Sequence, residues 1–120
     1  MTLMDFPSHT VLTDEWRPVC RLADLEPLWG EAALIGDLQV AIFLLPDGRI
    51  YAVSNADPAT GSHVMSRGIV GSRGGRPTIA SPLHKDVFDL ETGHCYTKPD
   101  SLSLPTWRVR EADGLISIAP

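Results

Sequence analysis

The sequence predicts an all-β domain, built as an antiparallel sandwich or small barrel. Ten glycines and ten prolines in 120 residues favour many turns and few long helices. Short apolar or alternating runs recur along the chain, separated by turn sequences such as Pro46-Asp47-Gly48 and Asp113-Gly114. The length suits a single domain that can bury a core of its own.

The N-terminal part carries weaker signals than the rest. Residues 1–14 show no sustained periodicity and are expected to form an arm, the least ordered part of the chain, ahead of a domain at 15–120. Residues 16–20 are typical of a short edge strand. Within 22–30, Asp24 can cap a single helical turn, which the following proline and glycine keep short.

Three pairs of strand-like segments are joined by turn sequences and predict β-hairpins. They are 39–45 with 50–53, 87–90 with 94–97, and 106–110 with 115–118. Their apolar residues, with one from a neighbouring segment, make up the predicted core: Val40, Ile42, Phe43, Ile50, Ala52, Val53, Ile79, Phe88, Leu90, Val109, Ile116 and Ile118.

Two segments, 54–68 and 80–86, depart from the strand–turn pattern. Irregular loops on a rigid β scaffold commonly carry function, so these are the candidate functional loops. Between them, the glycine-rich and locally basic stretch 71–77 is typical of a hairpin tip. Its backbone amides and two arginines could also bind an anion, although it lacks the Lys-Ser/Thr pair that ends a phosphate-binding loop.

Charge and hydropathy argue against several classes of protein. A net charge of −5 disfavours a nucleic-acid binder. No apolar run approaches the roughly 18 residues of a membrane span. The N-terminus lacks the basic start of a secretory signal. We therefore expect a cytoplasmic protein with no membrane partner, in which Cys20 and Cys95 stay free thiols rather than a disulfide.

The usual metal and catalytic patterns do not occur in the sequence. No two cysteines or histidines have ligand spacing, and the neighbours His94 and Cys95 would point to opposite faces of a strand. Ser81 and His84 form only a weak pair, outside any nucleophile elbow. We expect no metal site and no catalytic residue. The side chains weighed as metal ligands are His9, His63, His84, His94, Cys20 and Cys95.

One arrangement of the two loops is more specific. A strand ending in Asn55 runs into Asp57-Pro58-Ala59, and Ala80-Ser81-Pro82-Leu83-His84 precedes a phenylalanine-containing strand and a Thr-Gly turn. This arrangement resembles the Rieske iron–sulfur fold, in which two such loops carry C-x-H and C-x-x-H. Two cysteines hold one iron of that [2Fe–2S] cluster and two histidines hold the other.

The resemblance implies an all-β, Rieske-like antiparallel sandwich with two ligand-type loops at one end. It places Asp57 and Ala59 at the first cysteine and histidine positions, and Ser81 and His84 at the second pair. Only His84 keeps the type of residue that binds the cluster. The resemblance therefore predicts the fold without the cluster.

A closer resemblance runs through residues 14–119. Its most specific stretches are Ser66-Arg67-Gly68-Ile69-Val70-Gly71 and Ser81-Pro82-Leu83-His84-Lys85. With Asp24-Leu25-Glu26-Pro27 and Phe88-Asp89-Leu90-Glu91-Thr92-Gly93, they resemble the small subunit of assimilatory NAD(P)H-dependent nitrite reductase. Many members of that family lack the cluster ligands.

This resemblance implies a partner. In the family, a large subunit carries flavin, a [4Fe–4S] cluster and sirohaem, and reduces nitrite to ammonium in nitrate assimilation. The small subunit is then an accessory subunit, with no cofactor and no catalytic centre of its own. Two alternatives are a Rieske-type ferredoxin, which would need the missing cysteine pair, and a cluster-free β interaction module with a different partner.

The resemblance also suggests where the large subunit docks. The two loops would meet at one end, so residues 55–66 and 81–86 would form the docking face. Within it, Asp57 and His84 either pair directly, or Asp57 caps its own turn while His84 is solvated. The expected docking residues are Asp57, Arg67, His84 and Lys85.

Overall fold

The computed structural model describes residues 16–119, and its regular structure is almost entirely antiparallel β-sheet. The strands are β1 (Arg17–Arg21), β2 (Glu31–Ile35), β3 (Leu38–Leu44), β4 (Ile50–Ser54), β5 (Ile69–Arg73), β6 (Arg76–Ala80), β7 (Val87–Asp89), β8 (Thr106–Ala112) and β9 (Leu115–Ala119). Two single 3₁₀ turns, η2 (Leu22–Asp24) and η3 (Met65–Arg67), interrupt them. In this part of the chain, no helix has the length and apolar character needed to cross a membrane.

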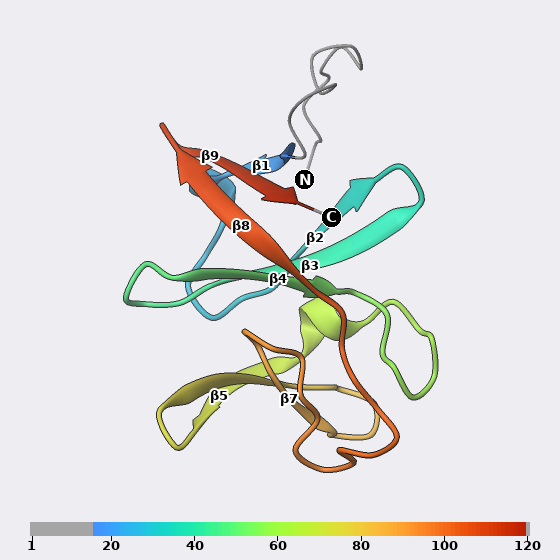
Figure 1. Ribbon diagram of the computed structural model, residues 1–120. Coiled ribbons are helices and arrows are strands. Elements are labelled where there is room, and N and C mark those ends of the chain that lie inside the picture. Colours follow the sequence, from blue (N-terminus) through green and yellow to red (C-terminus); the bar gives the residue numbers. More distant parts are fainter. Residues whose placement is uncertain (1–15, 120) are drawn as a thin grey trace.

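The strands form two sheets. The larger has the order β1-β9-β8-β4-β3-β2, and the smaller has the order β5-β6-β7. In Figure 1 the smaller sheet lies below the larger one, with η3 between them. The predicted all-β sandwich is confirmed, while the predicted arm at 1–14 lies outside the described residues.

Two of the three predicted hairpins are confirmed. β3 pairs with β4, and β8 with β9, in antiparallel register around their Asp-Gly turns. The third is wrong in its second half, because residues 94–97 form no strand and make only isolated bridges, such as Phe88 with Cys95. The chain turns at Lys98, whose carbonyl accepts two later amides, so the ladder stops there. β2 was not predicted.

β3 separates two clusters of buried side chains. Val40 and Ile42 belong to one cluster, with residues from β1, β4 and β9, while Ala41 and Phe43 belong to the other, with residues from η3, β6 and β7. Side chains alternate across a strand, so a continuous apolar run is what a strand buried on both faces requires. The predicted core residues are buried, except for Ile50 and Val109, which are half-buried.

Asn55, directly after β4, determines where the first loop leaves the sheet. Its Nδ2 donates to Gln39 Oε1 at 3.2 Å, and its Oδ1 accepts the amide of Ser66 at 2.8 Å. Its carbonyl accepts the amide of Met65, which is buried in the cluster that contains Phe43. The buried Asn55 thus joins the larger sheet to η3, and the loop 56–64 is held between these two anchors.

Candidate functional site

The first candidate loop is organised by Asp57, whose exposed fraction is only 1%. Its Oδ1 accepts the amide of Ala59 at 2.7 Å, and its carbonyl accepts the amide of Gly61 at 2.7 Å. A short carboxyl side chain in such a turn takes the place of a backbone acceptor. Asp57 therefore caps its own turn, and Ala59 lies exposed after it.

The second candidate loop is organised by Ser81, which is also 1% exposed. Its amide donates to the carbonyl of Asp86 at 2.9 Å, and its carbonyl accepts the amide of Lys85 at 3.0 Å. Lys85 adopts a left-handed conformation with φ of 61° to close this turn. The closure leaves His84 and Lys85 exposed at the end of the loop.

A buried hydrogen bond joins the two loops. The hydroxyl of Ser81 donates to Oδ2 of Asp57, across 24 positions of sequence. Together with Ala59, this contact uses both carboxyl oxygens of Asp57. No hydrogen bond or ion pair between Asp57 and His84 occurs within 16–119, so the two residues do not pair directly there.

The structure thus divides the expected docking residues into two groups. Arg67, at the end of η3, and His84 and Lys85, in the second loop, are exposed. Asp57 is buried with its carboxyl group turned toward Ser81, so it supports the loops from beneath and does not lie on a docking surface. The expected exposure of Asp57 does not occur, because both of its carboxyl oxygens are bonded inside the fold.

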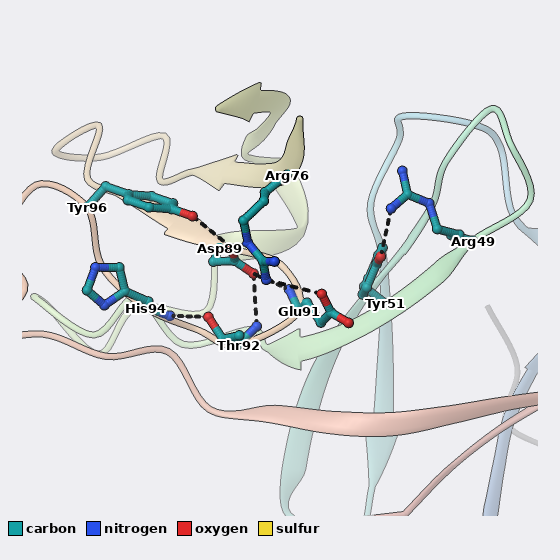
Figure 2. Close-up of polar contacts among 8 residues, drawn as sticks. All are labelled: Arg49, Tyr51, Arg76, Asp89, Glu91, Thr92, His94 and Tyr96. Carbon is teal, nitrogen blue, oxygen red and sulfur yellow. Dashed lines mark hydrogen bonds and ion pairs between the residues drawn. The ribbon is translucent and has the colours of Figure 1, made fainter. Parts of the chain in front are cut away.

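A second polar cluster, which the sequence analysis missed, surrounds Asp89 at the end of β7 (Figure 2). Its side chain is 1% exposed, and its Oδ2 accepts Arg76 Nε at 2.5 Å and the Tyr96 hydroxyl at 2.8 Å. Oδ1 accepts Arg76 Nη2 at 3.1 Å and the amides of Glu91 and Thr92 at 2.8 and 3.0 Å. The β6–β7 register brings Arg76 and Asp89 together, although thirteen positions separate them.

These contacts shift the ionisation of the cluster. Burial alone would raise the pKa of Asp89, but the hydrogen bonds from Arg76, the Thr92 amide and Tyr96 outweigh it and hold that pKa well below its usual range. The hydrogen bond to Asp89 raises the pKa of the Arg76 guanidinium, and it also raises the pKa of the Tyr96 phenol. Asp89 is therefore an ionised carboxylate that holds the turn after β7.

The glycine-rich tip is confirmed as a hairpin, formed by β5 and β6. Both of its arginines are engaged within the protein: Arg76 binds Asp89, and the Arg73 guanidinium lies 4.9 Å from the centre of the Tyr96 ring. These contacts favour the hairpin interpretation of 71–77 over an anion cradle.

The two cysteines are buried, free thiols, as expected. Cys20 packs in the cluster with Val40, whereas Cys95 packs in the cluster with Phe43. Burial, followed by the nearby charges of Asp24 and Glu31, raises the pKa of Cys20 to about 12. Such a thiol is inert as a nucleophile at neutral pH.

Comparison with known proteins identifies related sequences and structures. Residues 15–119 match the family described as Rieske-like [2Fe-2S] domain. The small subunit of nitrite reductase (NADH) from Escherichia coli K12 is 36% identical over 105 residues, which cover 87% of this chain and 96% of the relative. A Mycobacterium tuberculosis structure, described as an NADH-dependent nitrite reductase small subunit, is 43% identical with a TM-score of 0.82, covering 88% of this chain and 94% of that one.

A further relative is a much longer protein than this chain. The nitrite reductase [NAD(P)H] large subunit of Klebsiella oxytoca is 36% identical over 101 residues, covering 84% of this chain but only 10% of that protein. A segment similar to this chain is therefore part of a much longer polypeptide in that organism.

The [2Fe–2S] cluster in the family description can be tested against the residues present. Such a cluster needs two cysteine thiolates on one iron and two histidines on the other. The two loops contain no cysteine, and of the four cluster positions only His84 keeps a ligand-type side chain, since Asp57 and Ser81 bond to each other and both cysteines are buried elsewhere. His63 is also exposed in the first loop, but two histidines without thiolates do not make a Rieske ligand set. Within the described part, no group of three or more His, Cys, Asp or Glu side chains could hold a metal ion. The donor set does not fit a Rieske cluster.

The Asp57–Ser81 bond generates a prediction about stability. Ser81→Ala should lower the free energy of unfolding by about 2 kcal/mol, because it leaves a buried carboxyl oxygen without its donor. A double-mutant cycle with Asp57→Ala, followed by urea unfolding, should give a coupling energy of about 1–3 kcal/mol. Ser72→Ala, at an exposed position of β5, should stay within about 0.5 kcal/mol of the parent. A coupling energy near zero would contradict this account.

The Asp89 cluster generates a prediction about pH. The pKa of Asp89 is lower in the folded than in the unfolded chain, so its stabilisation is complete above the unfolded value of about 3.9 and is lost as pH falls through the folded value. Asp89→Asn should cost about 2–3 kcal/mol at pH 7, and the difference from the parent should shrink below about pH 4. Urea unfolding across this pH range measures both effects. Asp100→Asn, at an exposed position, is the control; a pH-independent cost for Asp89→Asn would refute the assignment.

Proposed function

We propose that this chain is an accessory subunit of NAD(P)H-dependent nitrite reductase. The chain belongs to the Rieske-like [2Fe-2S] domain family and, within that family, to the nitrite reductase small subunits. The observation that carries the proposal is the E. coli relative, since the similarity spans 96% of that small subunit. The partner in this proposal is the large subunit of the enzyme. The Klebsiella large subunit supports this, because it contains a segment similar to this chain.

In this proposal the redox chemistry takes place in the large subunit. Reduction of nitrite to ammonium takes six electrons and therefore requires redox cofactors, for which the proposed carriers are the partner's flavin, [4Fe–4S] cluster and sirohaem. The donor set of the two loops supports a small subunit that binds no cluster. This chain then contributes a binding surface and no catalytic centre.

The proposed docking surface includes the exposed end of the two loops. Arg67, His84 and Lys85 are its polar residues, and the Asp57–Ser81 bond beneath them holds the two loops in one arrangement. A loop that is already ordered loses less conformational entropy when a partner binds. The buried bond therefore favours a stable complex without contacting the partner.

Two other functions are less well supported. A Rieske-type ferredoxin would need thiolates in the two loops, and the cysteines of this chain are buried in its core clusters instead. A β interaction module with an unrelated partner remains as the outcome of a negative binding experiment.

Co-purification with the large subunit tests the proposal. The parent chain should form a stable complex with a tagged large subunit of the same organism. The double variant with Arg67→Glu and Lys85→Glu should weaken binding about tenfold or more, because reversed charges at a docking surface repel the groups that the native charges attract. Titration of the labelled small subunit measures the change.

The matched control is the double variant with Arg17→Glu and Arg21→Glu, an equal change of charge at two exposed positions of β1. It should leave the affinity unchanged. Absence of any complex with the parent chain would reject the proposed partner, and loss of binding in the control alone would move the docking surface to another part of the domain.

A further inference from the structure

The exposed apolar side chains are unevenly distributed. Among the described residues, the two most exposed large apolar side chains are Ile69 at 74% and Trp29 at 72%, and Leu28 follows at 50%. All three line one groove of about 630 Å³ between residues 28–32 and residues 66–70. We call it the Trp29–Ile69 groove. Single exposed apolar residues are ordinary, but a group of them around one groove marks an interaction site.

The turn that carries Leu28 and Trp29 is strained. The amide of Trp29 donates to the carbonyl of Glu26 at 3.1 Å, and Pro27 occupies the second position of this four-residue turn. Leu28 has a φ of 71°, at the position of a type II turn that normally takes glycine or asparagine. The chain thus keeps a large apolar side chain where a small residue would suit the backbone better. Strain of this kind is concentrated at functional sites.

Close packing places this turn beside η3. A Cβ atom on Gly30 would lie 2.1 Å from the carbonyl oxygen of Ser66, so only glycine permits the approach. The approach brings Trp29 to the wall of the groove opposite Ile69. Gly30 therefore permits the close packing that forms the groove, and Leu28 and Trp29 give it an exposed apolar wall.

One wall of the groove carries a strand edge. Among the strands of residues 16–119, β5 pairs with β6 alone, so it is the outer strand of the smaller sheet. An exposed strand edge that begins with a large apolar residue is a template for an added extended segment. Arg67 also lines the groove, and no carboxylate within 16–119 forms an ion pair with it.

We infer that the Trp29–Ile69 groove receives an extended apolar segment of the large subunit, with an acidic side chain opposite Arg67. This inference rests on the proposed function and locates the apolar centre of the interface. The groove is continuous with the proposed docking loops, since Ile69 pairs with Ala80 and Ser81 follows directly. His84 and Lys85 are then polar residues of the rim, while Trp29 and Ile69 are the anchors, as in other interfaces where a few central side chains dominate binding.

Affinity measurements with the purified large subunit holoenzyme test the inference. Trp29→Ser and Ile69→Ser should each weaken binding about 30-fold or more, as expected for central anchors. Leu34→Ser is the matched control, because Leu34 is an exposed leucine of β2 outside the groove. It should change the affinity by less than about twofold.

Leu28→Asn separates binding from folding. Asparagine tolerates the left-handed backbone, so the unfolding temperature should not fall, while the affinity for the large subunit should drop about fivefold or more. Hydrogen–deuterium exchange should slow in residues 28–32 and 66–70 when the complex forms. Unchanged affinity in the Trp29, Ile69 and Leu28 variants would overturn the inference and leave the proposed function intact.

Two other outcomes would also overturn the inference. Failure of the parent chain to bind the large subunit would reject the proposed function, and this inference with it. A concentration-dependent dimer of the small subunit alone, abolished by Ile69→Ser, would assign the groove to a second copy of this chain and overturn the inference.

Discussion

The arrangement of the candidate site depends on one buried contact, the hydrogen bond from Ser81 to Asp57. It joins a loop that leaves the larger sheet after β4 to a loop that leaves the smaller sheet after β6. In the Rieske fold a metal cluster makes this connection through its cysteine and histidine ligands. A hydroxyl and a carboxyl group make it here, at a position from which water is excluded and a hydrogen bond is correspondingly strong.

The rest of the structure holds these two residues in place. β3 is buried on both faces and contributes side chains to both core clusters, so it packs against β1, β4 and β9 on one side and against η3, β6 and β7 on the other. Asn55 anchors η3 to the larger sheet, and Asp89 anchors the turn after β7 with five accepted hydrogen bonds. Both are buried polar residues with all partners supplied by the protein, an arrangement that specifies one geometry. The result is an ordered end of the domain in which the two loops are held in one arrangement.

The sequence was sufficient for two of the three predicted hairpins, for most of the core and for the two loops, because alternation and Asp-Gly turns are local signals. β2 was missed since its Glu31-Ala32-Ala33 start has weak strand preference and acquires its place only by pairing with β3. Asp89 was placed correctly in a strand, but its burial depends on Arg76, which the sheet register brings close. Trp29 was also missed, because a large apolar side chain is ordinarily expected in the core and its exposure is a tertiary property.

We propose that the Asp57–Ser81 bond takes the place of the cluster that a Rieske domain holds between these two loops. The most direct test is the iron and acid-labile sulfide content of the chain, purified without oxygen and incubated with ferrous iron and sulfide. The account predicts no stoichiometric iron or sulfide and no Rieske-type electron paramagnetic resonance signal after reduction, since the loops supply no thiolate. About two irons and two sulfides per chain, with such a signal, would contradict it.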